Sequence, residues 1–256
     1  MDSLVNQTLE EIEIIAVNNG SEDGSLEILE KYKKLYPEKV TICTIPHAER
    51  AGAGRNFGIK KAKADYVGFC DSDDFMDLEA FQRLYELAIK EDSDIVYSDF
   101  MHVIDNEECK LISLSKKNNI TKSDLFFNGN LALWNKLYKK ELLLSAGDMP
   151  EDFGFEDFAY YPIVVSKANK ISYLRRPTYY YVVRENSEVN AAGSIRMLDA
   201  LKAAMYSAQN VNEKDRQPLL YANVGRIINA VNSRWIFFDA YIDFFKVAQK
   251  ELKDYL

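Results

Sequence analysis

Histidine and cysteine are scarce in this sequence, with two histidines and three cysteines in 256 residues. Cys43, Cys70 and Cys109 lie far apart and form no CxxC pair, so the sequence predicts neither a disulfide framework nor a thiolate zinc site. His47 and His102 are too few for a zinc site built from histidine. A metal site in this protein would therefore have to be built from carboxylates.

Basic residues are fewer than acidic residues, and long apolar runs are also scarce. Lys and Arg total 32 against 40 Asp and Glu, which gives a formal net charge of −8. This balance argues against a nucleic-acid-binding surface and against a polybasic membrane anchor. We find no apolar run long enough to span a bilayer and no signal peptide, so we expect a cytoplasmic protein, with peripheral attachment at the inner face of the membrane as the alternative.

The first hundred residues alternate between strand-like and helix-like patterns. Apolar runs that end in turn residues predict strands, and apolar residues at helical spacing predict helices. The strands are expected at 13–17, 40–45, 66–70 and 94–98, and the helices at 25–36, 54–64 and 78–88. Repeated β-α-β units predict an α/β, Rossmann-like fold with a mostly parallel sheet flanked by helices.

The remainder of the chain divides into two parts. The stretch 102–123 is polar and irregular, and helical or strand-like segments follow it at 138–145, 157–166, 171–174 and 179–183. After Arg184 the pattern is helical only, over 194–209 and 217–256 with a break near Ser233. We therefore expect an α/β domain over residues 1–190 and a helical C-terminal region over residues 191–256.

Two polar clusters follow predicted strands. Asn18-Asn19-Gly20-Ser21 comes after the first strand, and Asp71-Ser72-Asp73-Asp74 comes after the third. Ligands of α/β sheets bind beyond the carboxyl ends of the strands, so both clusters are predicted to border one site.

Asp71 and Asp73 are the sharpest chemical signal. Two carboxylates held close together repel each other, whereas hard ions such as Mg²⁺ and Mn²⁺ prefer carboxylate oxygens and keep positions open for phosphate. The alternative is an acidic turn that begins the next helix, with Asp74 or Asp77 as its cap. The spacing alone leaves both interpretations open.

Several stretches together resemble bacterial family 2 glycosyltransferases of the GT-A fold, in order and in spacing over residues 1–190. They are residues 3–8, 13–21, 54–59, 66–74, 134–138 and 155–157, and the block Tyr179-Tyr180-Tyr181 with Arg184 and Ser187. The resemblance implies an inverting, metal-dependent enzyme of the hexosyltransferase type that moves a sugar from a nucleotide diphosphate to an acceptor hydroxyl. It also implies a role in the synthesis of a surface polysaccharide or glycoconjugate, with a saccharide or lipid-linked acceptor.

The resemblance implies a role for each block on the donor side. Asn18, Asn19, Gly20 and Ser21 would hold the nucleotide base, with UDP as the preferred nucleotide. Arg55 would lie near the diphosphate together with Asp71, Ser72 and Asp73. Asp73 would be the direct ligand of Mn²⁺ or Mg²⁺, with Asp71 nearer the ribose.

On the acceptor side, the resemblance assigns the general base to Asp157 of the pair Glu156-Asp157. An inverting transfer needs one carboxylate that deprotonates the attacking hydroxyl. The alternative is that the pair only supplies favourable charge to a helix N-terminus. The other acceptor-side candidates are Asp74, Trp134, Asn135 and Lys136, although Trp134 is equally compatible with the core.

Two departures from the family pattern leave a second hypothesis open. The sequence begins within the first helix of the pattern, without the strand that normally precedes it, which would leave neighbouring strand edges unpaired. Asn18-Asn19 stands where the family usually has an aspartate, and an amide accepts a hydrogen bond more weakly than a carboxylate. A catalytically silent relative that acts in binding or assembly, with a homodimer among its possible forms, is therefore the alternative.

Overall fold

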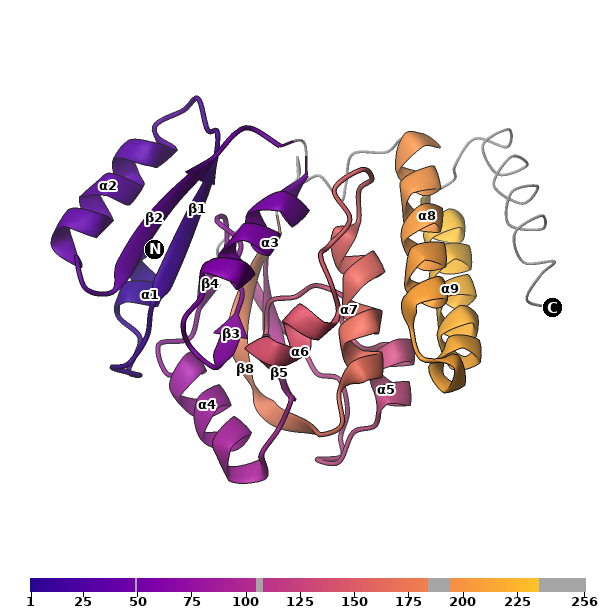
Figure 1. Cartoon of the computed structure of the whole chain (residues 1–256). Helices are drawn as coiled ribbons and strands as arrows, with labels where there is room; N and C mark the ends of the chain where they lie inside the picture. Colours follow the sequence, from indigo (N-terminus) through magenta and orange to yellow (C-terminus); the bar gives the residue numbers. More distant parts are fainter. Residues whose placement is uncertain (49, 105–107, 184–193, 235–256) are drawn as a thin grey trace.

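The computed structural model describes residues 1–48, 50–104, 108–183 and 194–234 (Figure 1). The described chain has an α/β architecture with helices on both sides of the sheets, and the two C-terminal helices lie together at one end (Figure 1). The family block at Arg184 and Ser187 and the aromatic-rich segment 235–245 lie outside the described residues.

The first layer is a pair of parallel strands. Strand β1 (Ile14–Asn19) pairs with β2 (Val40–Ile45), with Ile14 opposite Val40. Helices α1 (Asp2–Val5) and α2 (Ser25–Leu35) lie beside this pair (Figure 1). Val5, Ile14 and Val40 form a small apolar cluster, which joins α1 to both strands.

The larger sheet has six strands, of which five follow the order β3-β7-β5-β8-β4, and the sixth, β6, pairs with β5 outside this order. The strands are β3 (Tyr66–Gly68), β4 (Phe75–Met76), β5 (Ile95–Ile104), β6 (Glu108–Ile112), β7 (Lys136–Lys139) and β8 (Ile171–Val183). Strand β5 is the centre of this sheet, because it pairs with β6, β7 and β8.

The prediction of a mostly parallel sheet is wrong for this larger sheet. Of the six pairings in the described chain, only β1–β2 and β5–β8 are parallel. Strand β7 enters between β3 and β5 in the opposite direction, and β6 forms a hairpin with β5 inside the stretch that was predicted to be irregular. Local periodicity identifies a strand but not the direction of the strand beside it. The direction decides whether a pairing is parallel or antiparallel.

Five helices cover the larger sheet or connect its strands. They are α3 (Ala51–Lys61), α4 (Ala80–Glu91), α5 (Lys122–Asn128), α6 (Lys140–Ser145) and α7 (Glu156–Lys167). In α4, Ala80, Leu84 and Ala88 recur every four residues and are fully buried, as expected of an amphipathic helix. Helix α7 is apolar around most of its circumference and lies in the main core.

Helices α8 (Ser194–Asn210) and α9 (Glu213–Arg234) form the described part of the C-terminal region. They pack against α7 and α5, and Leu201 and Ala204 of α8 share an apolar cluster with Phe158 and Ala159 of α7. The region is therefore packed against the helix that carries Glu156 and Asp157. No helix within the described ranges is long and apolar enough to cross a membrane.

Strands β1 and β3 border one large cavity of about 1870 Å³. Within the described residues β1 pairs only with β2, and β3 pairs only with β7, so the two sheets stay separate. Ile15 and Val17 of β1 and Tyr66 and Gly68 of β3 line the same cavity. Residues at or after the carboxyl ends of both strands, among them Asn19 and Asp71, also line the cavity.

Candidate active site

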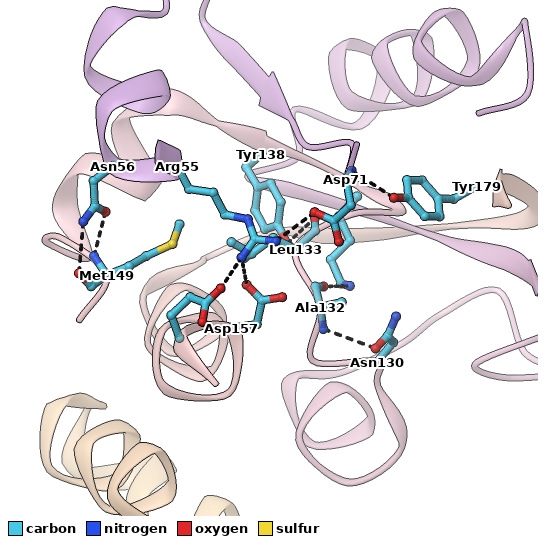
Figure 2. Close-up of polar contacts among 12 residues, drawn as sticks. Arg55, Asn56, Asp71, Asn130, Ala132, Leu133, Tyr138, Met149, Asp157 and Tyr179 are labelled. Atoms are coloured by element: carbon cyan, nitrogen blue, oxygen red, sulfur yellow. Dashed lines mark hydrogen bonds and ion pairs between the residues drawn. The ribbon is translucent and has the colours of Figure 1, made fainter. Parts of the chain in front are cut away.

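A single guanidinium joins three carboxylates at the cavity wall (Figure 2). Arg55 of α3 donates from Nη2 to Asp71 Oδ1 at 2.8 Å. From Nη1 it donates to Glu156 Oε1 at 2.6 Å and to Asp157 Oδ1 at 3.0 Å. The Arg55 side chain is 16% exposed. The predicted base, its neighbour and the first residue of the acidic turn therefore share one partner.

The local sequence explains why these groups meet. Asp71 follows β3, where the strand ends, and Glu156 and Asp157 are in the first turn of α7. Gly54 of α3 faces Val17 of β1, and a Cβ there would meet Val17 at 3.7 Å, an ordinary van der Waals distance. Helix α3 packs against β1, and from this position Arg55 reaches all three carboxylates.

The charges shift the pKa values of this cluster. Burial lowers the pKa of Arg55, but Asp157, Asp71 and Glu156 outweigh that effect and hold it above its usual value. Burial raises the pKa of Asp157 to about 6, although the Arg55 cation opposes the rise. A carboxylate with a pKa near neutrality is suited to accept a proton in a general-base step.

The acidic turn places its members in different surroundings. Asp71, Ser72 and Asp73 line the cavity. Asp74 does not line it, because its carboxylate accepts from the Tyr179 hydroxyl at 2.7 Å and from Val182 N at 2.8 Å. Asp74, which was predicted on the acceptor side, is therefore buried and holds the turn to β8.

A metal would have few protein ligands here. Within the described residues, no three His, Cys, Asp or Glu side chains are grouped to hold an ion. Mg²⁺ often binds through one or two carboxylates together with substrate phosphates. Asp71 and Asp73, which line the cavity beside each other, fit that pattern, although Asp71 is shared with Arg55.

The predicted base-binding turn uses its amides within the protein. Asn18 Oδ1 accepts from Ser21 N at 3.1 Å, and Asn19 exchanges two hydrogen bonds of 2.8 Å with the backbone of Ala48. Gly20 has a φ of +64°, and a Cβ there would meet the His47 backbone at 2.8 Å. Of the four predicted residues, only Asn19 lines the cavity. The other three shape the turn and do not form part of the cavity wall.

Trp134 is packed among aromatic rings and also borders the cavity. The side chain is 6% exposed and stacks on Tyr179 with ring centroids 4.5 Å apart and on Tyr181 at 5.5 Å, while it still lines the cavity. Aromatic rings in this arrangement offer a face or an edge to a sugar.

Asn135 and Lys136, which were predicted on the acceptor side, are buried within the protein. They are 0% and 1% exposed, and neither lines the cavity. Lys136 Nζ donates to Ala132 O at 2.6 Å, to Asn135 Oδ1 at 2.8 Å and to Trp134 O at 3.3 Å. Burial of a cation requires such partners, so Lys136 holds the loop that presents Trp134.

Arg50, Asp199 and Arg226 also line the cavity, and they are among the cavity residues that were not predicted from the sequence. Arg50 precedes α3, Asp199 lies on α8 and Arg226 lies on α9. Burial lowers the pKa of Arg226 to about 10. No motif distinguishes these residues from other charged helix residues, since only the packing of the C-terminal helices places Asp199 and Arg226 at the site.

Replacing Tyr179 by Phe is expected to destabilise the acidic turn. The Tyr179 hydroxyl donates to Asp74 and accepts from Asp71 N at 3.1 Å, and the residue is fully buried. Phe keeps the ring stack but leaves both groups without this partner, at a cost of about 1–3 kcal/mol in the free energy of unfolding, measured in urea. Tyr32→Phe, which removes an exposed hydroxyl, is the control. Equal losses in both variants would contradict the assigned role of Tyr179.

Comparison with known proteins identifies the family. Residues 1–144 match the model described as Glycosyl transferase family 2. The chain is 35% identical over 196 residues to a poly(ribitol-phosphate) beta-glucosyltransferase of Bacillus spizizenii, covering 73% of this chain and 30% of the relative. It is 30% identical over 229 residues to a cholesterol galactosyltransferase of Borreliella burgdorferi, covering 82% of this chain and 62% of the relative. The chain thus spans less than two thirds of either relative.

Solved structures show the same fold. The crystal structure of S. aureus TarS 1-349 in complex with UDP-GlcNAc matches with a TM-score of 0.78 and 21% identity, covering 98% of this chain and 75% of that one. A mannosyltransferase from Pyrobaculum calidifontis in complex with GDP-Man and Mn²⁺ matches with a TM-score of 0.58 and 13% identity, covering 98% and 75%. The α/β fold is therefore that of the GT-A glycosyltransferases, and the chain belongs to glycosyl transferase family 2.

Proposed function

We propose that this protein is an inverting glycosyltransferase that moves a sugar from a nucleotide diphosphate, preferably UDP, to an acceptor hydroxyl. The observation that carries the proposal is the cluster around Arg55, which joins the acidic turn of the donor side to the Glu156-Asp157 pair at one cavity. The similarity to a poly(ribitol-phosphate) beta-glucosyltransferase and to TarS in complex with UDP-GlcNAc supports a sugar-nucleotide donor and a role in surface polysaccharide or glycoconjugate synthesis.

Asp157 acts as the general base in this proposal. Arg55 occupies one of its carboxylate oxygens, and the other is available for the proton of the acceptor hydroxyl. One base on the face opposite the departing diphosphate gives inversion at the anomeric carbon. Glu156 shares Arg55 with Asp157 and helps to hold the guanidinium between them.

Asp71 and Asp73 would hold Mn²⁺ or Mg²⁺ in the proposed enzyme. A bound metal would neutralise the leaving diphosphate as a Lewis acid. Arg55, which keeps its charge throughout the accessible pH range, can also contribute positive charge to the diphosphate. Trp134 and Tyr181 supply the aromatic part of the acceptor wall.

The silent relative remains a second candidate, because one observation favours it. The amide oxygens of Asn18 and Asn19 already accept backbone N–H groups, so each has less capacity left for a nucleotide base. A protein with this turn that binds no nucleotide would act through assembly instead.

Calorimetric titration with UDP, with and without Mn²⁺, separates the two candidates. We expect Mn²⁺-dependent binding that Asp73→Ala weakens by at least about tenfold, or about 1.4 kcal/mol. Asp23→Ala, which removes an exposed carboxylate on another turn, is expected to bind UDP like the wild type. If the folded wild type binds no UDP in either condition, the enzymatic proposal fails and the silent relative is supported.

A further inference from the structure

The C-terminal helices contribute one carboxylate to the turn that precedes the candidate base. Asp199 of α8 accepts from Gly154 N at 3.0 Å and from Arg50 Nη2 at 3.4 Å, both through Oδ2. Its side chain is 8% exposed, and the residue lines the cavity. Asp199 therefore joins three segments that are distant in the sequence.

The turn before α7 has an unusual backbone conformation that needs support. Phe155 has a φ of +62°, in the left-handed region, and α7 begins at the next residue without a side-chain cap. Non-glycine residues adopt this conformation only where the surrounding structure holds it. A Cβ on Gly154 would lie 3.3 Å from both Arg50 Nη1 and Asp199 Oδ2, so glycine lets the backbone come close to these two groups.

Asp199 also forms a second link between two elements that Arg55 already joins. Arg50 immediately precedes α3, the helix that carries Arg55. Gly154 lies three residues before Asp157, which Arg55 contacts directly. The start of α3 and the approach to α7 are thus connected on one side by Arg55 and Asp157, and on the other side by Arg50, Asp199 and Gly154.

Apolar packing supports the same arrangement. Phe153 and Phe158 flank the turn and share a buried cluster with Leu201 of α8 and Ile227 of α9. A displacement of α8 would therefore move both the hydrogen bond to Gly154 and the apolar support of the turn.

We propose that Asp199 is a positioning residue of the transferase reaction, which fixes the turn at Gly154 and Phe155 so that Asp157 faces the acceptor. This inference rests on the proposed function, and it makes the helical C-terminal region a part of the active site. Asp199 touches no reacting atom in this role, since it acts through the Gly154 N–H and Arg50.

The chain offers a matched control at the other end of α7. Asp215 of α9 is also buried, and it accepts from the Ser166 hydroxyl at 2.7 Å near the end of that helix. Asp199→Ala and Asp215→Ala each remove one buried carboxylate that joins a C-terminal helix to α7. Of these two residues, only Asp199 contacts the turn that precedes Asp157.

The experiment measures UDP release from UDP-N-acetylglucosamine with water as acceptor, together with the melting temperature. We expect Asp199→Ala to lower kcat about 10- to 100-fold with an unchanged Kd for UDP, as for a misplaced catalytic group. Asp199→Asn keeps an oxygen that accepts from Gly154 N–H, so it is expected to recover most of the kcat. Asp215→Ala is expected to lower the melting temperature and leave kcat unchanged.

Two outcomes would overturn the inference: a wild-type kcat in Asp199→Ala, or equal losses of kcat in the two alanine variants. A wild type that is inactive with this donor concerns the choice of donor sugar or the proposed function, not the role of Asp199. In that case amide hydrogen exchange decides the positioning role. If amide exchange at residues 154–157 is faster in Asp199→Ala but not in Asp215→Ala, the positioning role of Asp199 is supported. If exchange at these residues is unchanged in both variants, the positioning role is overturned.

Discussion

Replacement of Asp157 by Asn is expected to lower the rate of sugar transfer by about 10²–10⁴-fold, the range typical of a lost general base. Asn has nearly the same shape and can still accept from Arg55, so the fold and UDP binding should persist. The measurement is UDP release from UDP-N-acetylglucosamine, with Asp148→Asn at an exposed ion pair as the control. A variant that retains more than about a tenth of the activity would exclude Asp157 as the base.

The pKa of Asp157 also predicts how the activity of the wild type depends on pH. Burial raises the pKa of Asp157 to about 6, and a base works only when it is deprotonated. Activity is therefore expected to rise with pH through about 6 and to be lost below it. If kcat/KM is still flat down to pH 4.5, the base has an ordinary carboxylate pKa or is another group.

Replacement of Arg55 by Met is expected to produce the largest loss of stability among the site variants. The guanidinium is mostly buried and is the shared partner of Asp71, Glu156 and Asp157. Its removal leaves three carboxylates close together without their cation, at a cost of about 3–5 kcal/mol in the free energy of unfolding. Arg55→Lys should recover only part of this, because one ammonium cannot bridge three carboxylates in the fixed geometry of a guanidinium.

The control for Arg55 is an exposed arginine. Arg83 pairs with Glu79 one helical turn away, with side chains that are 34% and 47% exposed. Exposed pairs of this kind contribute little to stability, so Arg83→Met should unfold in urea close to the wild-type midpoint. If Arg55→Met is as stable as Arg83→Met, the carboxylates of the cluster do not depend on Arg55, and the site has been misinterpreted.

Most elements in the first hundred residues were predictable from sequence, although β4 was not predicted and α3 begins three residues earlier than expected. The strand at residues 40–45 and the helix over 25–36 match β2 and α2 closely, because apolar periodicity and flanking Gly or Pro act on the backbone locally. The acidic turn was also predictable, since Asp71 and Asp73 directly follow an apolar strand.

The direction and order of the strands were not predictable from this pattern. Strand β6 lay in a polar stretch whose side chains gave no apolar alternation, and the two strand-like segments 171–174 and 179–183 proved to be one strand, β8. Strand β7 is antiparallel to both β3 and β5. Its short sequence fits either direction, and the packing of the whole sheet decides between them.

The surroundings of the site residues also depended on packing. Asn135 and Lys136 look like surface groups in the sequence, yet they are buried and serve a loop, because local hydrogen bonds compensate their burial. Trp134, two residues away, reaches the cavity. Position along the chain therefore does not show which of these neighbouring side chains is buried and which lines the cavity.

The sequence by itself determined which residues have the chemistry for the proposed reaction: the carboxylates of the acidic turn, the Glu156-Asp157 pair and Arg55. Only the tertiary structure decided that they meet, because Arg55 lies 16 residues from Asp71 and 102 from Asp157. It also decided that Asp199 of the C-terminal helices contacts the turn before Asp157, although it lies 45 residues beyond Gly154. The physical reason is that side-chain pattern specifies local backbone geometry, whereas the contacts between distant segments are specified by the packing of helices and strands against one another.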